Sequence, residues 1–371
     1  MAVHIAAAFL NSNFVLRIGF GFRYSNLSVM HALDGDAGYN YSRIMAKARG
    51  VEARLDRLRR LRTEVLGPEQ RAELRQALLD KSNLVAAEAA EIAGARMATD
   101  LAPDLVAAFG RFMSDPEETD KRCAAKIAIV EALNKLEYDR ADVYLTGIRH
   151  VQMEPRWGGS DDTAAPLRVN AAFGLVRINY PDVVLMLADL LADSENTARA
   201  GAAQALGASG SRAAIPLLRF KAKLGDDDPA VIAECLTALM TAAPEESLPF
   251  VAGFLDDASE AIQEGAAFAL AESRRADALE ILKKHWPEAR HSSLREALLL
   301  AISMTRLPAA LDFLLEIISE GDQAAALAAV SALAIHRHNE AVKERIVSAI
   351  GKKKDPALLD RFKKKFESNS T

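Results

Sequence analysis

The polar residues that could do chemistry are concentrated in one segment, which reads VYLTGIRHVQMEPRWGGSDDTAAPLR at residues 143–168. Binding or acid–base work needs titratable and hydrogen-bonding groups held close together, and a binding surface usually also has an apolar anchor. Trp157 stands between Arg156 and two glycines, which is typical of an exposed anchor. The candidate binding residues are Tyr144, Arg149, His150, Gln152, Glu154, Arg156, Trp157, Asp161 and Asp162.

The same residues also allow purely structural interpretations, and the sequence leaves both kinds open. Trp157 could fold back and cover the apolar end of a neighbouring helix. His150 and Glu154 would lie one helical turn apart if this segment were helical, which would make half of a metal site. A hydrogen-bonded structural pair is the commoner outcome of that spacing.

No motif in the chain defines a reaction. GASGS at residues 207–211 lacks the Lys-Ser/Thr that follows a phosphate-binding loop, and no serine stands in a nucleophile elbow. Two cysteines and seven scattered histidines give no zinc spacing, and HRH at residues 336–338 is better explained as a solvated turn. We therefore expect no catalytic residue, no cofactor and no bound metal.

A repeat organises the elements that must position this segment. AAQAL at 202–206 recurs as CLTAL, AAFAL and AVSAL, so that Ala205, Ala238, Ala269 and Ala332 lie at multiples of about 31 residues. Earlier copies, AAEIA and IVEAL, are each followed by about ten extra residues before the next copy. Each excess predicts an inserted loop, and the second insertion coincides with residues 143–168.

Each unit reads as two helices. An Ala-rich helix is followed by a short Gly/Ser/Asn/Pro break and then by a helix rich in Leu, Ile and Val, such as AIPLLRFKAKL. Alanine allows helix backbones to approach closely at no cost in helix propensity. Gly207 is predicted to end its helix with a positive φ. The expected fold is all-α, a right-handed α-solenoid of about eight stacked helical hairpins between residues 82 and 366.

The pattern Ala-Ala-x-Ala-Leu-Gly, a break and Ala-Ile-Pro-Leu-Leu resembles the HEAT repeat, an armadillo-like α-solenoid unit. It is most similar to the short bacterial type first described in phycobilisome lyases, and the resemblance covers roughly residues 82–350. It implies a bacterial scaffold or binding surface. A minority of such proteins attach bilins to other proteins, and some related helical repeats excise alkylated bases.

The ends of the chain do not match the repeat. Residues 1–44 are expected to be a poorly structured or non-native extension, in which FVLRIGFGF could form a strand. Residues 45–81 are predicted to be capping helices of the 82–366 solenoid, and residues 367–371 a frayed tail. The apolar face predicted for the first capping helix consists of Leu55, Leu58, Leu61 and Val65.

The charge distribution limits the expected classes of partner, and the cysteine content indicates the expected cellular location. The chain carries −5 overall, but residues 1–62 hold 10 Lys/Arg against 4 Asp/Glu and residues 343–371 hold 9 against 4, which leaves −16 between them. An acidic body disfavours nucleic acid, and basic groups split between two ends disfavour a membrane. Cys123 and Cys235 lie in apolar helical patterns, which indicates reduced thiols and a cytoplasmic location.

The function predicted from these observations is a non-catalytic scaffold. We expect a monomer that binds another protein or peptide on the inner face of the solenoid, which the second helices would line. The acidic body favours a basic partner. The alternative is a bilin lyase-like or other ligand-handling enzyme on the same fold, although the predicted inner helices offer few aromatic or nucleophilic groups for it.

Overall fold

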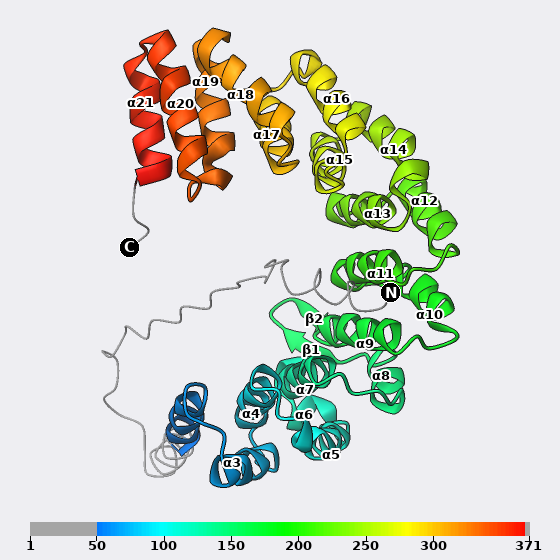
Figure 1. Ribbon diagram of the computed structural model, residues 1–371. Coiled ribbons are helices and arrows are strands. Elements are labelled where there is room, and N and C mark those ends of the chain that lie inside the picture. The colour runs from blue at the N-terminus through cyan, green and yellow to red at the C-terminus, as the bar shows by residue number, and fades with distance from the viewer. Residues whose placement is uncertain (1–49, 368–371) are drawn as a thin grey trace, which may run out of the picture. The chain divides into compact units, whose positions relative to one another are not determined.

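The structure is a computed structural model that describes residues 50–367, and this part of the chain is helical apart from short connections and one β-hairpin (Figure 1). Residues 50–61 form its first helix. The other elements are α3 Pro68–Leu78, α4 Asn83–Ala95, η1 Thr99–Leu101, α5 Ala102–Phe112, α6 Pro116–Thr119, η2 Lys121–Cys123, α7 Ala124–Lys135, α8 Asp142–Gly147, β1 Met153–Arg156, β2 Gly159–Asp162, α9 Ala165–Arg177, α10 Val183–Leu190, α11 Asn196–Ala208, α12 Ala214–Leu224, α13 Pro229–Ala242, α14 Pro244–Ala252, η3 Gly253–Asp256, α15 Glu260–Glu272, α16 Ala276–His285, η4 Trp286–Glu288, α17 Ser292–Met304, α18 Pro308–Glu320, α19 Gln323–Ala332, η5 Leu333–His336, α20 Glu340–Lys353, α21 Pro356–Phe362 and η6 Lys363–Glu367.

Apart from the short helix α6, successive helices from α4 to α20 pair into eight helical hairpins, and neighbouring hairpins stack. The first helices, α4, α7, α9, α11, α13, α15, α17 and α19, each pack on the next one in this order. The second helices form the other layer, in which α18 packs on α20. The predicted all-α solenoid of stacked hairpins is therefore confirmed.

The position of the two layers differs from the prediction. Figure 1 shows the Ala-rich first helices α7, α9, α11, α13 and α15 on the inner side of the stack, with α10, α12, α14 and α16 outside them. The expectation that the second helices line the inner face is wrong. Small side chains suit the inner layer because the first helices make the closest contacts between hairpins.

Glycine and alanine stand where first helices touch. A Cβ built on Gly207 of α11 would lie 2.9 Å from both the Cα and the Cβ of Ala238 on α13. Gly94 of α4 meets Ala132 of α7 in the same way, at 2.9 Å from its Cα. Gly207 lies inside α11, so it permits close packing and does not end the helix; the positive φ, +66°, belongs to Gly210.

The segment before α4 forms a helical hairpin, and α3 packs on both α4 and α5. Leu55, Leu58 and Leu61 are buried as predicted, but Val65 is 85% exposed because the helix ends at residue 61 and Val65 lies in the connection to α3. The FVLRIGFGF segment lies outside the described residues.

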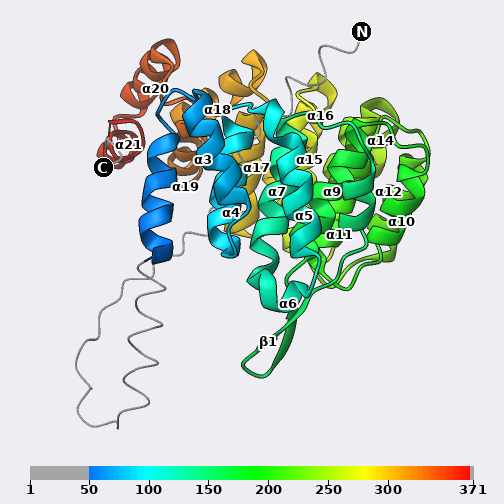
Figure 2. The ribbon, with the colours of Figure 1, turned by 90° about the horizontal axis from the view of Figure 1, so that it is seen from below.

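Both predicted insertions hold extra structure. The first carries α6 and η2, between α5 and α7. The second carries the antiparallel hairpin β1–β2, between α8 and α9. Figure 2 shows this hairpin projecting beyond the ends of the neighbouring helices, next to α6. Among residues 50–367, none of the helices combines the length and the apolar content that a membrane span requires.

Candidate binding site

The second insertion is built as a short hairpin with a tight turn. Met153 pairs with Asp162 and Arg156 pairs with Gly159, so Trp157 and Gly158 form the turn. Gly158 has φ of +89°, a conformation that glycine adopts without strain. Trp157 is 102% exposed at this tip, so it covers no helix of the described chain.

The base of the hairpin is fixed by Asp162, the last residue of β2. Its Oδ1 accepts from the backbone nitrogens of Gln152, at 3.0 Å, and of Ala164, at 2.9 Å. Its Oδ2 accepts from Nη1 of Arg168 at 2.7 Å. Burial alone would raise the pKa of Asp162, but these hydrogen bonds outweigh burial and lower it. The carboxylate is therefore held ionised, as a structural anchor.

The inner face of the hairpin is joined to the first insertion. Nε2 of Gln152 donates to the Asp120 carbonyl at 2.8 Å and to Oε1 of Glu154 at 2.6 Å. The same Glu154 oxygen accepts from Oγ1 of Thr163 at 3.0 Å and from the backbone nitrogen of Arg122. Arg122 has φ of +61°, which is unusual for a residue with a side chain, and Glu154 thus holds a strained turn.

An ion-pair ladder runs from this base along the first helices. Arg168 bridges Asp162 and, at 2.8 Å, Asp193 of the next hairpin, and its side chain is only 3% exposed. The equivalent residues each pair on one side only, Lys126 with the acid of the loop before its own helix and Arg199 with acids of the loop that follows its hairpin. Lys126 Nζ lies 3.1 Å from Oδ2 of Asp120, with both side chains 0% exposed, and Arg199 Nη2 lies 2.7 Å from Oδ1 of Asp226.

Sequence reasoning did not identify this ladder, although a signal was present. Asp precedes Lys or Arg by six residues at 120 and 126, at 162 and 168, and at 193 and 199. The shared spacing places each acid in the loop before a first helix and each cation in its first turn. The ladder fixes the hairpin to the stack, so it is a structural support for the site.

The predicted site residues divide into buried and exposed groups. Tyr144 is 0% exposed and donates from its hydroxyl to the Tyr138 carbonyl at 3.1 Å, so it belongs to the core. Gln152 and Asp162 are also buried, and His150 and Glu154 are partly buried. The residues of the set that face solvent are Arg149, Arg156, Trp157 and Asp161.

His150 and Glu154 do not form the helical pair that the sequence allowed. His150 precedes the hairpin and Glu154 lies in β1, and each contacts the Gln152 amide, His150 through Nε2 at 3.3 Å from Oε1. Burial lowers the pKa of His150. The described part of the chain holds no group of three or more His, Cys, Asp or Glu side chains placed to bind a metal.

The exposed face of the hairpin is more apolar than expected. Val151 is 57% exposed and Met153 is 45% exposed, and both precede Trp157 at odd-numbered positions. Because side chains alternate along a strand, Met153 faces away from Glu154 within β1. The available signal was the spacing of the apolar residues at positions 151, 153 and 157. We call Val151, Met153, Trp157 and the flanking Arg149 and Arg156 the hairpin surface.

Two cysteines lie outside this surface. Cys123 and Cys235 are both fully buried, and burial raises the pKa of each thiol to about 12. Both are free thiols that remain protonated near neutral pH.

Comparisons with known proteins find one family and several similar solved structures. A family model described as HEAT repeats matches residues 160–220, 219–303 and 249–334. No curated protein sequence matches the chain. Similar solved structures include the complex of CpcE and CpcF of phycocyanin lyase from Nostoc sp. PCC7120, with 19% identity over 64% of this chain and 90% of that one and a TM-score of 0.36. A Kap121p mutant has 14% identity over 79% and 41% of the two chains, with a TM-score of 0.41. Human deoxyhypusine hydroxylase has 19% identity over 73% and 99%, with a TM-score of 0.28.

Proposed function

Residues 160–334 consist of HEAT repeats, and on that premise we propose that the chain is a non-catalytic scaffold that binds another protein through the hairpin surface. The observation that carries this proposal is Trp157, a large side chain fully exposed on a base that hydrogen bonds hold rigid. Exposed aromatic side chains on rigid supports are the residues that dominate binding energy at protein interfaces.

The polar rim of the hairpin surface supports a protein partner further. Arg156 and Asp161 pair across the strands at 3.0 Å and both remain more than half exposed. Arg149 is exposed nearby. Such groups can orient a partner through charge-assisted hydrogen bonds while the apolar residues supply affinity. The acidic body, −16 between residues 63 and 342, favours a partner with basic groups.

Site-specific photocrosslinking tests this proposal. A photoreactive phenylalanine analogue replaces Trp157 in one sample and Phe220 in a matched control, because Phe220 is 66% exposed on α12, away from the hairpin. Each variant is expressed in the cells from which the native chain comes. The variant with the analogue at position 157 should crosslink one protein reproducibly, and that protein should bind the full chain when both are purified. A partner captured equally from both positions contradicts the assignment.

A further inference from the structure

The backbone of the β-hairpin has an edge without a partner. Within residues 50–367, β1 and β2 pair only with each other. The backbone nitrogen of Thr163 donates to the carbonyl of Gln152 at 2.9 Å, and hydrogen-bonded and non-hydrogen-bonded pairs alternate along antiparallel strands. Ser160 and Pro155 therefore form a non-hydrogen-bonded pair, and the N–H and C=O of Ser160 point away from β1.

The two outer edges of the β-hairpin differ. Pro155 has no N–H, so the edge of β1 lacks a donor, and proline is a residue that limits pairing at sheet edges. Ser160 keeps both groups, and no helix or loop of residues 50–367 hydrogen-bonds to its backbone. Residues 156–161 are all exposed, and Figure 2 shows this end of the β-hairpin beyond the ends of the helices. The outer edge of β2 is thus open to a further strand.

The glycine at the start of β2 leaves space for a neighbouring chain. Gly159 does not have a positive φ, and a Cβ built on it meets no atom within 4 Å. Neither the backbone nor the packing of the described chain therefore requires glycine there. Glycine inside a strand often marks the close approach of another backbone. The space lies on the same face of β2 as the Asp161 side chain, because side chains alternate along a strand.

The charges around this edge favour a basic partner. The side chain of Asp161 is 53% exposed and lies 3.0 Å from Nε of Arg156. The segment around α6, which Figure 2 shows next to the β-hairpin, adds the exposed acids Asp115, Glu117 and Glu118. A second copy of the chain would bring the same acids and the same net charge of −5, which repel each other. A basic segment of another protein fits better.

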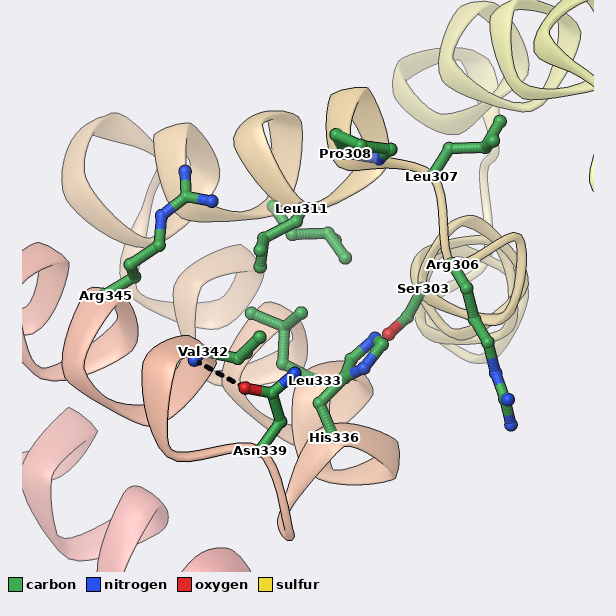
Figure 3. A pocket seen from close by; sticks show the side chains of 11 residues that line it. Ser303, Arg306, Leu307, Pro308, Leu311, Leu333, His336, Asn339, Val342 and Arg345 are labelled. Atoms are coloured by element: carbon green, nitrogen blue, oxygen red, sulfur yellow. Dashed lines mark hydrogen bonds between the residues drawn. The ribbon is translucent and has the colours of Figure 1, made fainter.

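The cavity between α17, α18, η5 and α20, of about 290 Å³, does not specify a ligand in this way (Figure 3). Two of its polar side chains are already engaged. Arg345 pairs with Asp312 at 2.6 Å, and Asn339 accepts a hydrogen bond from the backbone nitrogen of Val342 at 3.3 Å. Figure 3 shows the side chain of Arg306 leading away from the cavity. The unpaired backbone of β2, in contrast, requires an extended chain as its ligand.

We propose that the partner adds an extended, antiparallel segment to the outer edge of β2. This inference rests on the proposed scaffold function and names the class of partner. The partner residue opposite Ser160 exchanges two backbone hydrogen bonds with it. The residue before it lies beside Asp161 and is Lys or Arg, and the residue after it occupies the space over Gly159 and is large and apolar. The recognised sequence is therefore a basic residue, any residue and a large apolar residue.

Selection from random nonapeptides displayed on phage, with the full chain immobilised, tests this inference. The enriched peptides should share the basic and large apolar residues two positions apart. Their affinity, measured by fluorescence anisotropy, should fall about tenfold or more in Ser160→Pro, which removes the outward N–H and leaves the β1–β2 ladder intact. Ser160→Ala is the matched control, because it keeps the N–H and should bind as the native chain does. Both variants should melt at the native temperature.

A change in the peptide tests the same contact without a variant of the protein. An N-methyl group on the residue between the basic and the apolar one removes the donor to the Ser160 carbonyl and should also weaken binding about tenfold. Native affinity of the N-methylated peptide overturns strand addition, even where Ser160→Pro does not fold. Equal affinity for the native chain and a folded Ser160→Pro overturns it too, as does a selection that enriches no peptide.

Two further outcomes separate this inference from the scaffold function. Peptides that bind Trp157→Ala more weakly but bind Ser160→Pro normally overturn strand addition and leave the hairpin surface as the binding site. The scaffold function fails separately, if position 157 crosslinks no protein in preference to position 220. Light scattering of the free chain completes the test: a dimer that Ser160→Pro converts to a monomer would make a second copy the ligand of β2, and the basic partner would be wrong.

Discussion

Asp162, the last residue of the hairpin, accepts a 2.7 Å hydrogen bond from Arg168, which lies in the first turn of α9. Arg168 also pairs with Asp193, in the loop before the next helical hairpin, so a single guanidinium links the β-hairpin to two repeats. The exposed tip of the hairpin is rigid at its base because of this link. The site thus combines a solvated tip with a buried charged anchor.

Arg168→Met should destabilise the fold strongly. The substitution leaves the carboxylates of Asp162 and Asp193 without their cation in a site of low exposure, which costs roughly 3–5 kcal/mol for a buried pair. Urea unfolding followed by circular dichroism measures this change. Arg156→Gln is the control, because it breaks an exposed pair and should cost less than about 0.5 kcal/mol. Equal losses in the two variants would show that the anchor is not buried in solution.

Acid should weaken the fold partly through Asp162. The pKa of this carboxyl lies below its ordinary value of 3.8 in the folded chain, so the folded state stays ionised where the unfolded state takes up a proton. Its contribution to the unfolding free energy is complete above pH 3.8 and is lost as the pH falls through the folded pKa. Asp162→Asn should therefore reduce stability at neutral pH and flatten the fall in stability below the ordinary carboxyl pKa of 3.8. If the unfolding free energy of Asp162→Asn falls with pH as steeply as that of the native chain, Asp162 does not contribute to the acid sensitivity of the fold.

Overpacking of the first helices should also be costly. Ala205 and Ala269 are both 0% exposed where neighbouring helices meet, so Ala205→Leu or Ala269→Leu should cost about 1–3 kcal/mol. Ala261→Leu is the control, because Ala261 lies on the same helix as Ala269 but is exposed. Thermal melts of the three variants measure the difference. Unchanged melting temperatures for the two buried positions would mean that the helix faces are misassigned.

The fold was predictable because its main determinant is periodic. Ala205, Ala238 and Ala269 mark the inner layer at similar spacings, 33 and 31 residues, and the structure buries all three. The layer assignment failed because apolar content alone does not say which helix of a pair faces inward. Gly207 was misread for a related reason: an added Cβ at this position would lie 2.9 Å from Ala238, so the close contact requires glycine in the interior of the helix and not at its cap.

The candidate site was predictable as a segment but not residue by residue. The extra length of the second insertion located it, and polar content selected Tyr144 together with Trp157. Burial separated them, because the Tyr144 ring packs on Gly174, where an added Cβ would lie 2.4 Å from its Cδ1. The contribution of Met153 depends on strand alternation, which became visible only once the segment was known to be a hairpin.

The acidic body predicts a salt-dependent association. If the partner is basic, raising the salt concentration from about 50 mM to about 500 mM should slow association and weaken affinity, because exposed charges are screened beyond the Debye length. Surface plasmon resonance of the purified pair measures both rates. An affinity that rises or stays constant with salt would show that the charge of the body plays no part.

The most direct test of the account is the affinity of the crosslinked partner for Trp157→Ala, measured by calorimetry beside the melting temperature of the variant. Trp157 is fully exposed, so its removal should leave the melting temperature unchanged. Binding should weaken by about 2 kcal/mol or more, close to thirtyfold, while Phe220→Ala binds as the native chain does. Native affinity in Trp157→Ala, or a loss of stability in its place, would contradict the hairpin surface as the binding site.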